Sequence, residues 1–318
     1  MRRTSVVARA FALVLCVGTF GCGGRSDSSS AASNANARSS GSEAHATPTV
    51  IGPRLVRVTD ADTTVYLFGT VHVLHPSMTW MDARIEEAFG SARAVYFEVP
   101  TDPAAMAPHM ALLQSLALNP PGTTLSSLLP PDARERASAT ASRLGVPFAQ
   151  LEPMRPWIAA ITLMMSALAA RGIDPEAGVD CVLAARASER GQEVRYLETI
   201  DTQLRAVGGL AEAVQVELFV DALDDVEQSA AEMEALTEAW RRGDTQRLEA
   251  ELVGEMRAEA PALYDAILVS RNRAWVEVLA QLMEREPGTF FVAAGAAHFV
   301  GPDAVQTGLA ARGLTVSE

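Results

Sequence analysis

The sequence predicts an α/β fold with a mixed, largely parallel sheet, flanking helices and a helical insertion. Short apolar runs typical of strands alternate along the chain with helical patterns. A long helical block, punctuated by prolines, separates the early strands from the last ones. The 318 residues are 48% hydrophobic, which is ample for a core. The alternation favours parallel neighbouring strands, because such strands need a helix or other long crossover between them.

The early strands come from two apolar segments. Residues 54–71 predict a β-hairpin with its turn at 60–62, placed on an edge of the sheet. Residues 81–92 have helical spacing, and residues 92–100 predict a second strand that Pro100 ends.

The middle of the chain, residues 102–190, is predicted to be mostly helical. Within it, the apolar run 157–170 predicts a buried helix, because a membrane span needs about 20 apolar residues. Residues 191–201 predict a third strand. Helices then return over residues 202–285.

The last elements follow the second helical stretch. Residues 288–295 predict a fourth strand, residues 302–313 a last helix and residues 314–318 a short final strand. The sheet is therefore assembled from segments at both ends of the chain.

The N-terminus is predicted to direct the protein out of the cytoplasm. Residues 1–21 have the features of a secretory signal peptide, with arginines before an apolar run. Cys22 closes this run after a small residue, as in a lipoprotein signal, so we expect lipid on Cys22. A plain signal peptide cut nearby is the alternative. Residues 22–50 are rich in Ser, Ala, Gly and Asn and predict a disordered tether before a domain at 51–318.

These features predict a protein of the cell envelope that is anchored to a membrane by its N-terminal lipid. Asp is absent after Cys22, which favours the outer membrane of a Gram-negative cell, on its periplasmic side or its surface. Without the lipid, the protein would be secreted. The net charge of −13 makes a nucleic-acid partner unexpected, because phosphate binding needs a basic face.

Candidate functional residues stand where the predicted strands end. His72 and His298 each follow a strand at the third position after a glycine, Gly69 and Gly295. We expect these glycines to adopt backbone angles closed to other residues and to leave room for a close neighbour.

Two carboxylates end the other strands, Glu98 and Glu198. If the strands are parallel, all four side chains lie on one rim, where α/β sheets bind ligands. Each residue taken alone has an ordinary structural explanation, and only the combination indicates a site.

Two imidazoles and a carboxylate suit two kinds of chemistry. Together they can bind a divalent transition metal and leave positions open for water. Without a metal, they can act as a general base and its orienting carboxylate. His75, three residues after His72, is either a further ligand or a loop residue beside Pro76.

Residues 268–279 also contain an unusual pair. The spacing of the apolar residues predicts a helix with Ala274, Val278 and Leu279 facing inward. Arg271 and Asn272 on this helix either face solvent or belong to the functional site. In the second case, Arg271 holds a site carboxylate or an oxyanion.

Five segments, in order along the chain, resemble the TraB/PrgY/GumN group, which includes the Tiki proteases. They are LFGTVH, VYFEVP, GVDCVLAARASERGQEVRYLET, SRNRAW and AAGAAHFVG, within residues 54–318. The chain is similar, more distantly, to erythromycin esterases and haem-uptake lipoproteins. The resemblance implies an erythromycin-esterase- or Tiki-like fold and a site made of His72, Glu98, His298, Arg271 and Asn272.

The resemblance also implies an activity. Tiki members are regarded as metal-dependent proteases, so it implies a hydrolase of peptide or protein substrates with manganese or cobalt on His72, Glu98 and His298. Two alternatives remain, since some members act as pheromone regulators. They are a non-catalytic peptide or pheromone binder and a metal-independent, esterase-like hydrolase.

Overall fold

A computed structural model of the chain describes residues 52–223 and 226–318. The predicted signal peptide, the tether and Cys22 lie outside the described residues. None of the helices in the described part combines the length and apolar character that a bilayer crossing requires.

The centre of the fold is a six-stranded mixed sheet with the order β4-β3-β5-β2-β1-β6. The pairs β4–β3, β3–β5 and β5–β2 are parallel, whereas β2–β1 and β1–β6 are antiparallel. The sheet is thus mixed and largely parallel, as predicted. The strands are β1 (Leu55–Thr59), β2 (Thr63–Thr70), β3 (Ala94–Phe97), β4 (Glu193–Tyr196), β5 (Gly288–Gly295) and β6 (Thr315–Ser317).

The predicted hairpin is present, but it does not form an edge of the sheet. β1 and β2 pair across a turn in which the Asp60 side chain accepts from the backbone N–H of Asp62 and Thr63. The C-terminal strand β6 pairs with β1 and covers it. The edges are therefore β6 and β4, because the last strand returns antiparallel beside the first.

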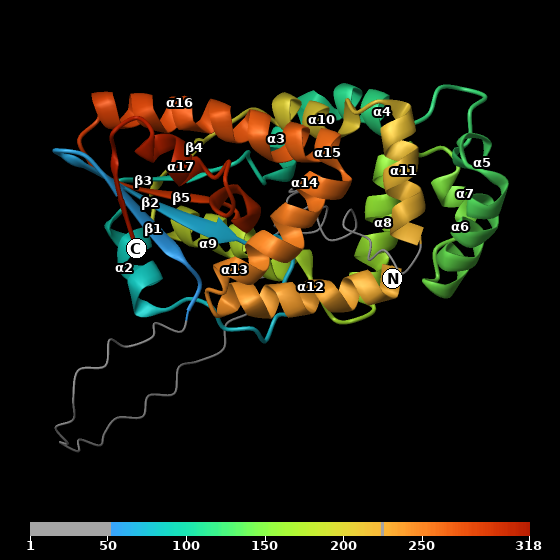
Figure 1. Cartoon of the computed structure of the whole chain (residues 1–318), viewed down its shortest axis with the longest axis horizontal. Coiled ribbons are helices and arrows are strands. Elements are labelled where there is room, and N and C mark those ends of the chain that lie inside the picture. The colour runs from blue at the N-terminus through green and yellow to red at the C-terminus, as the bar shows by residue number, and fades with distance from the viewer. Residues whose placement is uncertain (1–51, 224–225) are drawn as a thin grey trace, which may run out of the picture.

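Side chains alternate between the two faces of the sheet, and each face has its own core. In β5, Phe290 and Val292 pack on one side, and Phe291 and Ala293 on the other. The first core includes Trp275 and other residues of α16 (Ser270–Arg285) and α17 (Val305–Ala310), which lie along one face of the sheet (Figure 1). The second core includes residues of α2 (Ala83–Ser91) and α9 (Val179–Glu189) and continues into the helical insertion.

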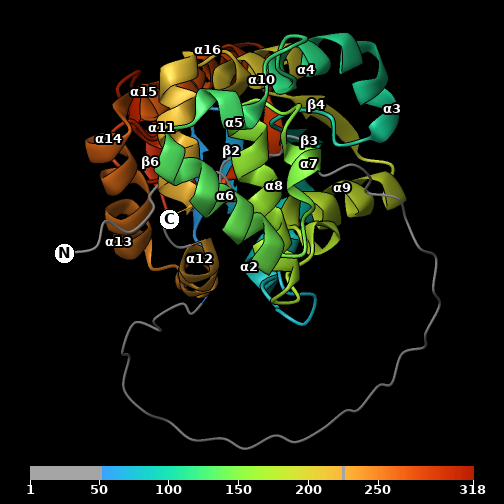
Figure 2. The same cartoon turned by 90° about the vertical axis from the view of Figure 1, so that its right-hand side faces the viewer.

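The first helices and the insertion follow the predicted order. The helices before β4 are α2 (Ala83–Ser91), α3 (Pro103–Met106), η1 (Ala107–His109), α4 (Met110–Ala117), α5 (Leu125–Leu128), α6 (Pro131–Arg143), α7 (Phe148–Leu151), α8 (Pro156–Ala169), η2 (Pro175–Ala177) and α9 (Val179–Glu189). The apolar run predicted to be a buried helix is α8, which contacts α11 and α12. Helices α5 to α8 and α11 gather beyond one end of the sheet, which Figure 2 views directly.

The helices after β4 return the chain to the sheet. They are α10 (Ile200–Gly208), α11 (Glu212–Leu223), α12 (Val226–Arg241), α13 (Thr245–Leu248), η3 (Glu249–Gly254), α14 (Glu255–Glu259), α15 (Pro261–Tyr264), η4 (Asp265–Val269), α16 (Ser270–Arg285), η5 (Ala296–Phe299) and α17 (Val305–Ala310). Two of these, η3 and η4, are π-helical, and η4 leads directly into α16. Single π-turns of this kind often lie near functional sites.

The register of the central strands places the two glycine–histidine turns side by side. β2 and β5 are parallel neighbours, and Gly69 pairs with Ala294 and Thr70 with Gly295. Their carboxyl ends therefore meet at the same edge of the sheet, and the turns that follow leave the sheet together.

Candidate active site

The strand ends bring two histidines to one carboxylate. The Nε2 atoms of His72 and His298 are each 3.9 Å from Oε1 of Glu98. The two nitrogens are therefore at most twice that distance apart, within the 8 Å that a shared site requires. All three side chains are buried. The cluster lies at the carboxyl ends of β2, β3 and β5, where parallel sheets bind ligands.

His72 is oriented by Asp180, in the first turn of α9. The Nδ1 atom of His72 is 2.7 Å from Oδ2 of Asp180, and Thr70 donates its hydroxyl to Oδ1 at 2.8 Å. Because a carboxylate only accepts, Nδ1 of His72 is the donor in this contact. Burial alone would raise the pKa of Asp180, but His72 and the Thr70 hydroxyl bring it below its usual range.

His298 is oriented by an amide instead of a carboxylate. Its Nδ1 contacts Oδ1 of Asn272, and Nδ2 of Asn272 donates to the carbonyl of Asp303 at 2.8 Å. The amide orientation is thereby fixed, so Nδ1 of His298 carries the proton and Nε2 the lone pair. Burial, followed by the charge of Arg271, places the pKa of His298 well below its ordinary value. The ring also packs on Trp275, with centroids 4.2 Å apart.

Arg271 is the only cation that contacts Glu98 within the described residues, apart from the histidines. Its NH2 group contacts Glu98 and donates to Glu198 Oε1 at 2.6 Å, and its Nε donates to the same carboxylate at 2.9 Å. Its NH1 donates to the Ile267 carbonyl at 3.0 Å and lies 3.3 Å from Nε2 of His298. Burial would lower the pKa of Arg271, but the two glutamates raise it, so the group stays protonated.

The inward face of α16 differs from the prediction. Ala274 is exposed and Val278 half-buried, whereas Arg271, Asn272, Trp275 and Leu279 are buried. Two polar residues therefore occupy an interior face, at a cost that their hydrogen bonds offset. Most of those partners come from segments distant in sequence, such as Glu98, Glu198 and the Asp303 carbonyl, which local helical spacing cannot indicate.

Glu98 has several donors around it. Oε1 accepts from the backbone N–H of Gly295 at 2.7 Å, and Oε2 accepts from Gln203 of α10 at 3.0 Å. Burial alone would raise the pKa of Glu98, but Arg271, the two histidines and the Gly295 N–H hold it below its usual range. The pKa of Glu198 is instead raised by burial, which Arg271 offsets only in part.

The charges of the cluster do not cancel. Glu98, Asp180 and Glu198 are three buried or nearly buried carboxylates, and Arg271 is one guanidinium. With both imidazoles neutral, the cluster carries net negative charge, which is costly in the interior unless a further cation or proton balances it.

The donors fit a divalent transition metal by type. Nε2 of His72, Nε2 of His298 and Oε1 of Glu98 are the atoms that could hold one. Ligands of one tetrahedral ion lie about 3.4 Å apart, closer than the 3.9 Å found here. In residues 52–223 and 226–318, no group of three or more His, Cys, Asp or Glu has the spacing of an assembled metal site.

The two glycines do not have the role that we expected. Neither Gly69 nor Gly295 has a positive φ, and Gly295 has φ −48° and ψ 133°, which other residues also adopt. Gly69 is needed for close approach, because a Cβ there would lie 2.9 Å from Cα of Ala296. The expectation of special backbone angles was wrong, and that of a close neighbour is confirmed for Gly69.

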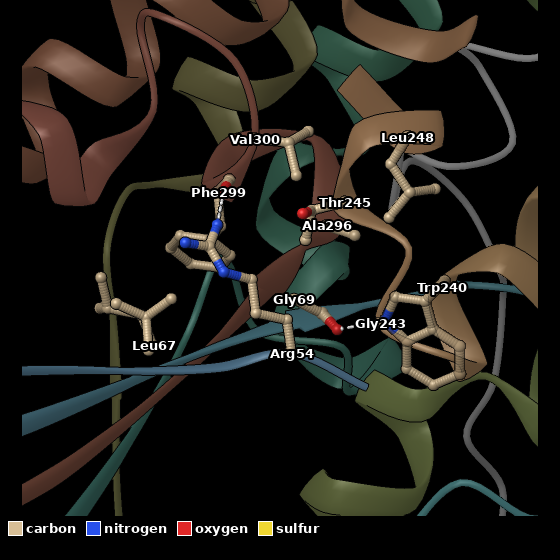
Figure 3. A pocket seen from close by; sticks show the side chains of 11 residues that line it. Arg54, Leu67, Gly69, Trp240, Gly243, Thr245, Leu248, Ala296, Phe299 and Val300 are labelled. Carbon is tan, nitrogen blue, oxygen red and sulfur yellow. Dashed lines mark hydrogen bonds between the residues drawn. The ribbon is translucent and has the colours of Figure 1, made fainter. Parts of the chain in front are cut away.

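A small cavity lies behind the two turns. Trp240 donates to the Gly69 carbonyl at 2.7 Å, and Arg54 donates to the Phe299 carbonyl at 3.0 Å (Figure 3). The cavity that these residues line is about 20 Å³, enough for one water. The residues that line this cavity hold the two turns through these hydrogen bonds, and the cavity is too small for a substrate.

A larger cleft reaches the other side of the cluster. It has a volume of about 600 Å³, lies between α10 and residues 265–274, and includes Glu198 and Arg271 in its lining. Its size falls within the range of small-ligand pockets.

Two other histidines lie outside the cluster. His75 is exposed and bonds to Ser77 at 2.7 Å, which fits a loop residue. His109 contacts Asp201. Sequence reasoning missed Asp180 and Gln203. Asp180 stands in one of the segments that carried the family resemblance, but nothing in its local pattern indicated a contact with His72.

Comparison with known proteins decides the family. The sequence profile of the TraB/PrgY/gumN family matches residues 55–318. The chain belongs to this family. Comparisons with curated proteins and with solved structures found no match. The match includes all five segments that carried the resemblance, from the first strand to the C-terminal residue.

Proposed function

We propose that this TraB/PrgY/gumN family member is a cell-envelope hydrolase that cleaves peptide or protein substrates with His72, His298 and Glu98. One observation carries the proposal: two buried imidazoles, each with Nδ1 against a side-chain oxygen, place Nε2 3.9 Å from one carboxylate oxygen. A merely structural pair of histidines would not need two separate devices that fix the same tautomer.

In the form we favour, His72, His298 and Glu98 hold a divalent metal, such as manganese or cobalt. Such an ion lowers the pKa of a bound water and polarises a carbonyl group. With both imidazoles neutral, the buried cluster carries net negative charge, which supports this form because a cation would balance it.

The chain's own groups have separable tasks in this proposal. His72 and His298 present lone pairs whose direction is fixed by Asp180 and Asn272. Arg271 is held in place by two carboxylates, and its NH1 group lies 3.3 Å from Nε2 of His298. From this position it would stabilise the oxyanion of a tetrahedral intermediate. The cleft above Arg271 has room for a short peptide segment beside the cluster.

A second candidate is a hydrolase that uses no metal. It is supported by Arg271, whose NH1 lies 3.3 Å from Nε2 of His298, where a guanidinium competes with a metal ion. In this form His72, backed by Asp180, is the general base, and Arg271 stabilises the oxyanion.

The test is turnover of a peptide library beside elemental analysis of full-length protein purified without chelator. We expect turnover, about one divalent ion per chain, and loss of both in His72→Ala and His298→Ala. His75→Ala is the matched control, because it removes an exposed histidine of the same loop. Turnover that survives complete metal removal favours the second candidate. Peptide binding without turnover under any divalent metal would instead indicate a non-catalytic binder.

The envelope location is tested separately. Mass spectrometry of the mature N-terminus should find Cys22 as the first residue with lipid attached. An unmodified start at any other residue would indicate a secreted protein.

A further inference from the structure

The segment Gly178–Asp180 stands out, because each of its three residues contacts the turn that carries His72. Gly178 lies so close to the His72 carbonyl that a Cβ would be 2.1 Å from its oxygen. Val179 donates its backbone N–H to the Val71 carbonyl at 2.9 Å. Asp180 binds the side chains of Thr70 and His72.

A second backbone contact fixes the same turn from its far end. Leu74 and Asp174 exchange two backbone hydrogen bonds, of 3.2 and 2.9 Å. The loop after β2 is thereby held along its length by residues 174–180. The position of Asp180 relative to His72 is consequently set by backbone contacts and does not depend on the two side chains alone.

We propose that Asp180 is a positioning residue that keeps the Nδ1 proton on His72 and thus keeps the Nε2 lone pair directed at Glu98. The inference rests on the proposed function for its catalytic meaning, but the tautomer itself does not depend on it. We further infer that Gly178 is required because it brings α9 close enough for this contact.

The physical reason is competition between two carboxylates for one proton. Oδ2 of Asp180 is 2.7 Å from Nδ1, whereas Oε1 of Glu98 is 3.9 Å from Nε2. While Asp180 is present, the shorter contact holds the proton on Nδ1. Without Asp180, Glu98 is the remaining carboxylate beside the ring in the described residues, so the proton is expected on Nε2. The lone pair that faces the site would then be lost.

The test is the tautomer of His72 in metal-free, full-length protein with ¹⁵N-labelled histidine. The chain has only five histidines, and the His72→Ala spectrum assigns the signal. At about pH 8, where ordinary imidazoles are neutral, we expect His72 in the wild type to carry its proton on Nδ1. Asp180→Ala should move it to Nε2, and Asp180→Asn, which keeps one acceptor, should give a smaller shift.

Asp201→Asn is the matched control, because it alters another Asp–His contact, that with His109, outside the site. It should change the His109 signal and leave His72 unchanged. An unchanged His72 tautomer in Asp180→Ala, or a wild-type proton on Nε2, would overturn the inference.

Gly178→Ala tests the geometric part while the carboxylate stays in place. The added methyl must displace α9 from the turn, so we expect the same direction of tautomer shift as in Asp180→Ala. If either variant fails to fold, as judged by circular dichroism, Thr70→Val provides the milder change, and we expect from it a small shift in the same direction. No shift in any folded variant would refute the inference.

Turnover provides the second readout. If the proposed function holds, Asp180→Ala should lower it about 10- to 100-fold, as is usual for partners behind a reactive histidine. If Asp180→Ala shifts the His72 tautomer but the wild type shows no turnover, the positioning role of Asp180 is retained and the hydrolase proposal is rejected. If the wild type shows turnover but Asp180→Ala does not shift the tautomer, the hydrolase proposal is retained and the positioning role is rejected.

Discussion

The two glycine–histidine turns are alike in sequence and differ in what holds them. Both follow parallel neighbouring strands, and both direct Nε2 at Glu98 from the same distance. Behind His72 stands a carboxylate, that of Asp180, whereas behind His298 stand the amide of Asn272 and the ring of Trp275. The NH1 group of Arg271 also lies 3.3 Å from Nε2 of His298.

A repeated local motif thus does not give a repeated electrostatic environment. A carboxylate favours a protonated neighbour, and a buried guanidinium disfavours one. Burial and Arg271 therefore keep His298 neutral, whereas the partner of His72 is a carboxylate. The helices α9 and α16, distant in sequence from the turns, decide which environment each histidine receives.

The largest effect should come from removing either histidine. His72→Ala and His298→Ala should each reduce turnover by roughly a thousand-fold or more, and the double variant should be little worse than either single one. The reason is that both rings serve one centre despite their different surroundings. The measurement is kcat/KM for a cleaved library peptide. If the two losses multiply in the double variant, the two histidines act separately and do not serve one centre.

Arg271→Ala should be the most destabilising change. It leaves Glu98 and Glu198 buried without their cation, at a cost of about 3–5 kcal/mol in the free energy of unfolding. Arg195 is the control, because it pairs with Glu286 at similar distances, 2.7 and 3.0 Å, on the partly exposed β4 edge. Arg195→Ala should cost about 1 kcal/mol or less. Urea unfolding of both variants measures the two losses of unfolding free energy. Equal losses would contradict the expected difference between the buried and the partly exposed arginine.

Asn272→Asp tests whether the two turns can be made alike. The new carboxylate cannot donate to the Asp303 carbonyl, so we expect a loss of about 1–3 kcal/mol in unfolding free energy. Asn119→Asp removes a similar amide donor, 2.7 Å from the Met154 carbonyl, at a half-buried place outside the site and should cost less. If Asn272→Asp is as stable as the wild type, the amide is not what distinguishes the His298 turn.

The smallest effect is the pH dependence of stability that His298 causes. Its folded pKa is depressed, so as pH falls below the ordinary value of about 6.5 the unfolded chain takes up a proton that the folded chain refuses. Stability should therefore fall by about 1 kcal/mol between pH 7 and 5.5 in chelator-treated protein.

The contribution is isolated by comparing wild type with His298→Gln over that pH range. The raised pKa of Glu198 acts with the opposite sign, since its contribution is lost as pH rises, and it cancels in this comparison. His75→Ala should keep the wild-type slope. Identical slopes in wild type and His298→Gln would show that His298 is not held neutral.

Much of the fold could be predicted from the sequence, because strands and helices leave local patterns. The hairpin, the parallel central strands and the helix α8 are confirmed. The prediction that the hairpin lies at an edge of the sheet was wrong, because nothing local indicates that β6 returns to pair with β1. The inward face of α16 was also misjudged, because its polar residues are buried by partners from distant segments.

The residues that stand at the strand ends could be recognised from the sequence, which predicted that His72, Glu98, His298 and Glu198 share one rim if the strands are parallel. That follows from strand polarity, which is a property of the local chain and of the crossovers between strands. Their partners depend on tertiary packing. Asp180, Asn272 and Arg271 reach the histidines through the packing of α9 and α16, and in a buried, low-dielectric place the nearest partner fixes each proton.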